Sequence, residues 1–171
     1  MFYMKSVEGP FASRLEAIQA VKKHLDEIMS QLAMTSFTLS TLIPKKELLM
    51  LTKLNQMTSS MSKLIHKMID LATGNIISNA VQEPIPAGEH MKEKQPNGYP
   101  NARAAYTTWV DDFTKECSRL INSWLKKFQD AEIQWKIEDI REAAMSMSYV
   151  AKDALQYILP WDIQLSPPTL D

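Results

Sequence analysis

The chain has 171 residues, of which 45% are hydrophobic and 23% are charged, and its formal net charge at pH 7 is −1. These proportions are typical of a globular protein, and a chain of this length can bury a core without disulfides or a structural metal. The balanced charge gives the whole chain no attraction to nucleic acid, anionic lipid or acidic substrates, so any such partner would need a local patch.

The cysteine content and the N-terminal residues bear on the compartment. A single cysteine, Cys117, excludes an internal disulfide framework and is compatible with a reducing compartment. The first residues, MFYMKSVEGPF, lack the charged start and apolar run of a secretory signal, and no apolar run is long enough to span a membrane. We therefore expect a cytoplasmic protein, or one within a particle assembled in the cytoplasm.

Residues 11–43 have the periodicity of an amphipathic helix. Their apolar side chains recur mostly at spacings of three and four, and Arg14 and Thr35 interrupt the stripe. The stretch Thr35–Leu42, TSFTLSTL, is rich in β-branched and hydroxyl residues, so we expect the last turns to fray or to end early. The apolar positions of this stripe are Phe11, Ile18, Val21, Leu25, Ile28, Leu32, Leu39 and Leu42.

Residues 44–73 predict a second helix, antiparallel to the first. Pro44 disfavours helical geometry at Ile43 and suits the first position of a new helix, and Gly74 stands where a C-cap is expected. The short break between the two segments predicts a helical hairpin. The apolar stripe alternates spacings of four and three and comprises Met50, Leu54, Met57, Met61, Leu64, Met68 and Leu71.

Four methionines lie on this second stripe, at positions 50, 57, 61 and 68. Because methionine is flexible and polarizable, such a stripe either fills a core or forms a pliable seam for a partner helix. A core is the more common use of an apolar helical stripe. The two uses are compatible, since a methionine-filled core is loosely specified and can open to admit a partner.

Residues 74–101 have no helical period and contain Pro84, Pro86, Pro96 and Pro100. A loop of this length is either functional or disordered, and fully extended it could cross a bundle along its length. We predict a crossover linker.

Residues 102–159 contain neither glycine nor proline, and they show two apolar stripes that are out of phase. We predict helices over 102–129 and 131–159, with a turn near Phe128–Glu132 and with Asp130 as an N-cap. The alternative is one long helix with a stutter.

Apolar residues away from the helical stripes indicate candidate partner-binding positions. Trp135, Met145 and Tyr149 lie off the stripe of the last helix, and a helix that is apolar on two sides is either central in the fold or covered by another chain. The proline-rich tail, residues 160–171, has apolar side chains without helical spacing, which must pack on the bundle or on a neighbour. The candidate residues are Trp135, Met145, Tyr149, Trp161, Ile163 and Leu165.

Lysines cluster at the two predicted hairpin turns. If the hairpins pack side by side with their turns at one end, these lysines converge there and form a candidate phosphate-binding patch for nucleic acid. The alternative is a set of ordinary solvated lysines. The four residues are Lys45, Lys46, Lys126 and Lys127.

Motifs for catalysis or metal binding are missing from the sequence. The four glycines are too scattered for a phosphate-binding loop. His24 precedes Glu27 by three residues and His66 precedes Asp70 by four, and we interpret both as surface pairs rather than metal ligands. Cys117 lies on a core-facing stripe, which predicts a buried structural thiol. We therefore predict no metal, no cofactor and no enzymatic activity.

These observations predict an all-α fold: two long antiparallel helical hairpins that form a four-helix bundle in one domain over 1–171, with a long crossover loop and an extended C-terminal arm. The leading functional hypothesis is a protein-protein interaction subunit, a structural or assembly component of a viral or phage particle, a secretion machine or another complex. One alternative is a secretion or assembly chaperone with a methionine-rich client seam. The other is a helical nucleic-acid-binding subunit of a ribonucleoprotein complex.

Overall fold

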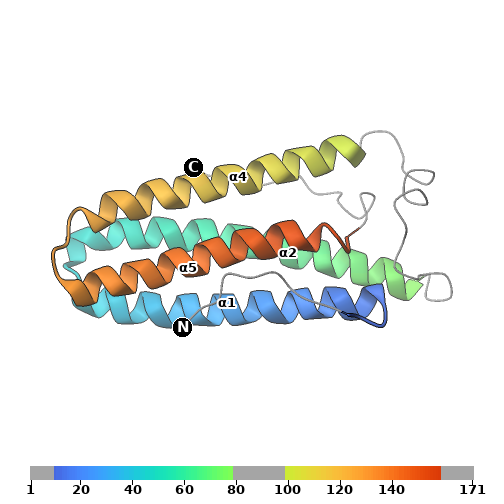
Figure 1. Cartoon of the computed structure of the whole chain (residues 1–171), viewed down its shortest axis with the longest axis horizontal. Coiled ribbons are helices and arrows are strands. Elements are labelled where there is room, and N and C mark those ends of the chain that lie inside the picture. The colour runs from blue at the N-terminus through green and yellow to red at the C-terminus, as the bar shows by residue number, and fades with distance from the viewer. Residues whose placement is uncertain (1–9, 79–98, 159–171) are drawn as a thin grey trace.

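The structure, a computed structural model, describes residues 10–78 and 99–158, which form an all-α four-helix bundle (Figure 1). A single 3₁₀ turn, η1 (Lys45–Glu47), precedes the second helix. Within the described ranges no helix has the length and apolarity that a membrane span requires. The four helices are α1 (Arg14–Leu42), α2 (Leu48–Ser78), α4 (Tyr99–Leu125) and α5 (Ala131–Ala154).

Neighbouring helices of the bundle run in opposite directions (Figure 1). Helix α1 packs against α2 and, most extensively, against α5, which also packs against α4. The two turns, residues 43–47 and 126–130, lie together at one end of the bundle, which we call the turn end. Helix α2 ends and α4 begins at the opposite end (Figure 1), so their connection need not run the length of the bundle. The predicted bounds of the crossover linker, 74–101, are wrong at both ends, because α2 continues to Ser78 and α4 begins at Tyr99. Its remaining part, residues 79–98, lies outside the described residues.

Helix α1 begins with Ser13 as its N-cap. The Ser13 side chain accepts a hydrogen bond from the Glu16 amide at 3.1 Å, and the Glu16 carboxylate accepts one from the amide of Ala12, one residue before the cap, at 3.0 Å. The expectation that this helix frays or ends early within TSFTLSTL is wrong, since the helix continues to Leu42. Burial of Leu39 supplies tertiary packing that propensity does not include.

The methionines of α2 fill the core. Met57, Met61 and Met68 are buried in the main hydrophobic cluster, and Met50 packs against it from a partly exposed position. The core interpretation of the stripe is therefore confirmed. The predicted C-cap at Gly74 is wrong, because α2 continues to Ser78. Ile76, beyond the glycine, is buried, and its burial outweighs the penalty of about 1 kcal/mol for glycine in a helix.

The second hairpin consists of two helices, so the alternative of one long helix with a stutter is wrong. Helix α4 ends at Leu125, and α5 begins at Ala131 with Asp130 as its N-cap, whose side chain accepts a hydrogen bond from the Ile133 amide. Helix α5 ends at Ala154, five residues before the predicted end, because the chain continues in tighter turns stabilised by hydrogen bonds to the Asp153 and Ala154 carbonyls.

The interruption of the first apolar stripe at Arg14 has a structural explanation. This side chain is only 1% exposed, and its Nε donates a hydrogen bond to the Tyr157 carbonyl, just beyond α5. Arg103 of α4 donates from Nη1 to the neighbouring Ile158 carbonyl at 3.1 Å. Arginines from two other helices thus satisfy two successive carbonyls of the turns that follow α5. The rings of Phe11 and Tyr157 meet edge to face at 5.8 Å beside them.

Replacing Met57 and Met61 together with leucine is expected to change the free energy of unfolding by less than about 1.5 kcal/mol, because the substitution conserves volume in a buried core. The matched control, Met61→Ala, leaves a cavity and is expected to lose about 2–5 kcal/mol. Urea denaturation followed by circular dichroism measures both variants. A loss in the double leucine variant as large as that of the control would contradict the packing described for α2.

Candidate interaction surface

The outer edge of α5 presents two of the predicted partner-binding residues to solvent. Trp135 is 72% exposed and Tyr149 is 49% exposed. They are fourteen residues apart, almost four full helical turns, so they lie on the same side of α5 about 21 Å from each other. Met145 differs from the other two because it is partly buried and packs against the core. The remaining three candidates, Trp161, Ile163 and Leu165, lie outside the described residues.

The breadth of the apolar surface of α5 is explained in part by its central position. This helix contacts α1, α4 and α2, so it buries residues over more than half of its circumference, including Ser146 and Asp153. The central position of α5 in the fold therefore explains most of its apolar residues, without a partner chain. It does not account for Trp135 or Tyr149, which point away from the other described helices.

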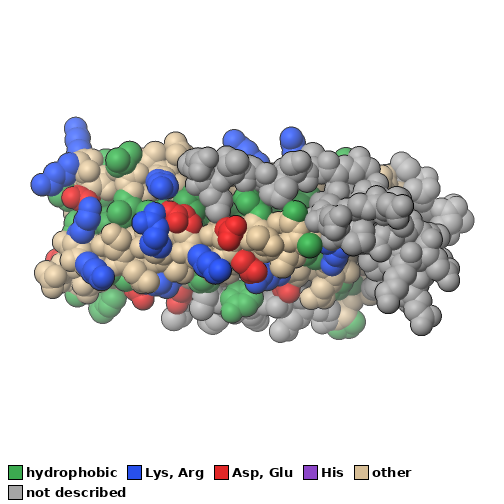
Figure 2. Space-filling view, turned by 90° about the horizontal axis from the view of Figure 1, so that it is seen from above, with side chains coloured by type: hydrophobic (Ala, Val, Ile, Leu, Met, Phe, Trp, Pro, Cys, Tyr) green, Lys and Arg blue, Asp and Glu red, His purple; other side chains and the backbone are tan. Residues whose placement is uncertain are grey.

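The four predicted lysines are placed at the turn end. Lys45 and Lys46 come from the first turn and Lys126 and Lys127 from the second, and Figure 2 shows lysine and arginine side chains at this end of the face that it presents. Lys127 Nζ lies 3.3 Å from Glu47 Oε2 and is thereby paired across the two hairpins. The other three are exposed. Acidic groups, including the Asp130 cap of α5, share this end.

Glu116 connects α2 with α4 near the turn end. It accepts a hydrogen bond from Arg119 Nε at 3.0 Å, and Lys53 Nζ of α2 lies 3.7 Å from its Oε1. The hydrogen bond from Arg119 lowers the pKa of Glu116 below its ordinary value, and the positive charges of Arg119 and Lys53 add to this, while desolvation opposes it. This carboxylate therefore stays ionised over a wider pH range in the folded chain.

Sequence reasoning missed a second group of exposed apolar side chains. Met34 and Phe37 of α1 are 60% and 72% exposed, and Leu49 at the start of α2 is also exposed. The available signal was their position, because large apolar residues that fall outside the core-facing stripe of an amphipathic helix must face solvent or a partner. At the other end of α2, Ile77 is exposed as well. Leu71, which the sequence placed on the core-facing stripe of α2, is also exposed, so the stripe does not extend to this residue.

His24 and His66, the two histidines in the described residues, each pair with one carboxylate. Within residues 10–78 and 99–158, no three His, Cys, Asp or Glu side chains are grouped so that they could hold a metal ion. His24 Nδ1 lies 4.0 Å from Glu27 Oε2, as the spacing predicts. His66 pairs with Asp26 on α1, at 2.8 Å from Nε2 to Oδ1, rather than with the predicted Asp70 on its own helix. It thus ties α1 to α2.

The candidate nucleophiles are not activated. Ser146 Oγ and His24 Nε2 are both buried without a hydrogen-bond partner. Ser62 Oγ lies 3.2 Å from His66 Nδ1, but the same nitrogen lies 2.8 Å from the Ser62 carbonyl, which can only accept a hydrogen bond. His66 Nδ1 must therefore carry a proton to bond this carbonyl, and in that state it cannot act as a base toward the Ser62 hydroxyl, although its Nε2 contacts Asp26. Cys117 is buried, and its burial raises the pKa of the thiol to about 12, with the charge of Glu116 contributing. The thiol is therefore protonated and unreactive, and the prediction of a buried structural thiol is confirmed.

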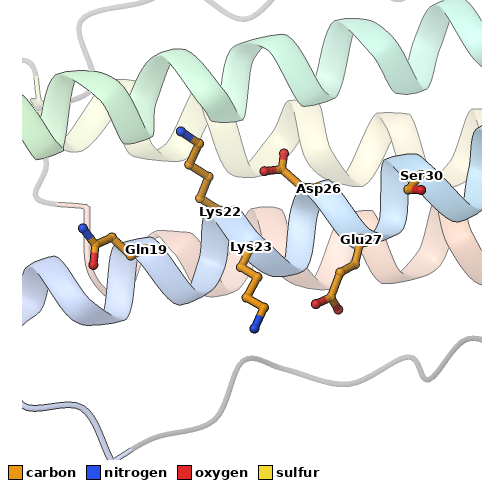
Figure 3. Close-up of a pocket in the computed structure, with 6 residues that line it drawn as sticks. All are labelled: Gln19, Lys22, Lys23, Asp26, Glu27 and Ser30. Atoms are coloured by element: carbon orange, nitrogen blue, oxygen red, sulfur yellow. The ribbon is translucent and has the colours of Figure 1, made fainter.

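A hollow on the outer surface of α1 is lined by polar side chains of that helix (Figure 3). Lys22 and Asp26 point to one side of the helix, whereas Lys23 and Glu27 point to the other. These groups do not converge on a common point, so the lining offers no focused chemistry for a ligand. The six residues are Gln19, Lys22, Lys23, Asp26, Glu27 and Ser30.

No protein-family model matches the chain, and no curated protein or solved structure matches it either. The clearest features on the surface of the bundle are the exposed apolar side chains and the lysines of the turn end.

The lowered pKa of Glu116 predicts a pH-dependent contribution to stability. Because the folded-state pKa lies below the unfolded one, the contribution is present above the unfolded value and is lost as the pH falls through the folded value. When the pH is lowered from neutral to about 3, we expect the free energy of unfolding to fall less in Glu116→Gln than in the wild type. Thermal unfolding at several pH values in this range measures the difference between the two proteins. The difference should be smaller in 1 M salt, where charges are screened beyond about 3 Å. Parallel pH profiles of the two proteins would contradict the expectation.

Proposed function

We propose that this chain is a non-enzymatic interaction subunit, a structural or assembly component of a larger complex, that binds a protein partner along the outer edge of α5. The supporting observation is the exposure of Trp135 at 72% on a helix held by contacts with three others. Tryptophan and tyrosine are enriched at the energetic centres of interfaces, because they bury a large area with little loss of conformational freedom.

The geometry of this edge suits an elongated partner. Trp135 and Tyr149 stand about 21 Å apart on one side of a straight, rigid helix. A partner helix lying along α5 would contact both. The apolar tail residues Trp161, Ile163 and Leu165 belong to the same proposal, as an arm that reaches a neighbouring subunit. We place such a complex in the cytoplasm.

A chaperone with a methionine-rich client seam is less well supported. Met57, Met61 and Met68 are buried against the other helices, so a client could reach them only if the bundle opened. A folded chaperone seam would be expected to expose part of its methionines, as promiscuous binding surfaces do.

The partner-binding role of α5 is tested with a photoactivatable amino acid at position 135 of the full chain, irradiated in extracts of the cells that express it. We expect one defined adduct with a protein of the complex, formed at position 135 and abolished by competition with unlabelled chain. The matched control carries the same amino acid at Lys67, an exposed polar position of α2. Equal adducts from both positions, or none from position 135, would overturn the proposal.

Nucleic-acid binding is the second candidate, favoured by the position of Lys45, Lys46, Lys126 and Lys127 at one end of the bundle. The pairing of Lys127 with Glu47 and the nearby acids weaken this patch. If it binds phosphates, a gel shift with single-stranded or duplex RNA at low salt should detect a complex, and Lys45→Glu with Lys126→Glu should abolish it. Absence of binding by the wild type at low salt would eliminate this candidate.

A further inference from the structure

Two stretches of the chain that lie side by side carry no charge. Residues 28–44, which include the second half of α1, contain no Asp, Glu, Lys, Arg or His, and neither do residues 54–62 of α2, in a chain that is 23% charged. The Ser36 hydroxyl donates a hydrogen bond to Asn55 Oδ1 at 3.0 Å, which fixes the two stretches next to each other. Most of residues 54–62 are buried, and α2 contributes only Gln56, which is exposed, and the partly exposed Asn55, Ser59 and Ser60. We call the outer surface formed by the exposed and partly exposed residues of 28–44 and 54–62 the uncharged face.

The most exposed apolar side chains of α1 lie on this uncharged face. Met34 and Phe37, one turn apart, are 60% and 72% exposed. Phe37 is on the side of α1 that faces α2, because Asp26, three turns earlier on the same side, bonds His66 of α2. The Asp26–His66 pair lies beyond one end of the face, and the lysines of the first turn lie beyond the other.

Three hydroxyl groups on the α1 part of the uncharged face already have acceptors within their own helix. Each donates to a carbonyl three or four residues earlier, at 2.6–3.1 Å. Burying this face would therefore leave these donors paired, which removes the penalty of burying these hydroxyls. The donors are Thr38, Ser40 and Thr41.

We propose that the uncharged face binds a second copy of this chain and forms a two-fold symmetric dimer. In such an interface, residues near the axis face their own copies, so a charge there would meet a like charge, and an uncharged face avoids this repulsion. Depletion of charge around exposed methionine and aromatic residues is also the composition of an interface core. A formal net charge of −1 opposes self-association only weakly.

The exposed part of the face lies mainly on α1, where the uncharged run is about 22 Å long. Specific interfaces begin at about 600 Å² per partner, so a second copy must cover Met34, Phe37 and the exposed polar side chains around them. The face belongs to α1 and α2, so a dimer formed through it leaves the α5 edge open, and either proposal can fail without the other.

The test is the solution mass of the full chain, measured by sedimentation equilibrium from low concentration to about 100 µM, well above a micromolar dissociation constant. We expect a dimer of the wild type whose dissociation constant rises about 30-fold or more in Phe37→Lys, as for the loss of an interface hot spot. Ile77→Lys is the matched control, because Ile77 is 63% exposed and lies on α2 outside the uncharged face. Circular dichroism should show unchanged folding in both.

A second arm is specific for a two-fold interface. Phe37→Lys and Phe37→Glu are each expected to be monomeric, and their mixture is expected to recover the wild-type mass, because opposite charges then meet across the axis. A wild type that stays monomeric at the highest concentration would overturn the proposal. So would a dimer that persists in Phe37→Lys, including one lost only in Trp135→Lys, which would place self-association on the α5 edge instead.

Discussion

The arrangement of this bundle depends on how the first helix meets the end of the last one. Arg14 is a buried cation whose Nε bonds the Tyr157 carbonyl, and Arg103 bonds the next carbonyl from the opposite side of the bundle. A buried guanidinium must keep its acceptors or return to water, so only one register of α1 against α5 satisfies it. Apolar packing along this pair, the most extensive in the fold, tolerates small slips more easily than this polar contact does.

Much of the fold could be predicted from the sequence because the apolar periodicity is regular. The two stripes with alternating spacings of three and four gave α1 and α2, and the change of phase before Asp130 gave the turn between α4 and α5. The errors concern helix ends, where local propensity competes with packing. Gly74 is helical because Ile76 behind it is buried. Leu42 is still helical because core packing of the buried Leu39 supports a stretch of weak helix formers.

The candidate surface was less predictable, since periodicity tells which side of a helix is buried but not what an exposed residue does. Trp135 and Tyr149 were found because they lie off the stripe of α5, and the same reasoning would have found Met34 and Phe37 on α1. Arg14 was noticed only as an interruption, because its acceptors are backbone atoms 143 residues away and leave no trace in composition. Asp26 as the partner of His66 was equally hidden, as it comes from another helix.

Burial in the core protects the methionines of α2 from oxidants only while the bundle is folded. Met57, Met61 and Met68 are inaccessible while the bundle is closed, so peroxide can reach their sulfur atoms only during opening. A sulfoxide formed then carries a polar oxygen into a cluster made mostly of apolar side chains, where an unpaired polar atom is costly. The chain can then no longer close as before, so each opening under oxidising conditions carries a risk of permanent unfolding. A core of leucine at the same positions would open and close without that risk.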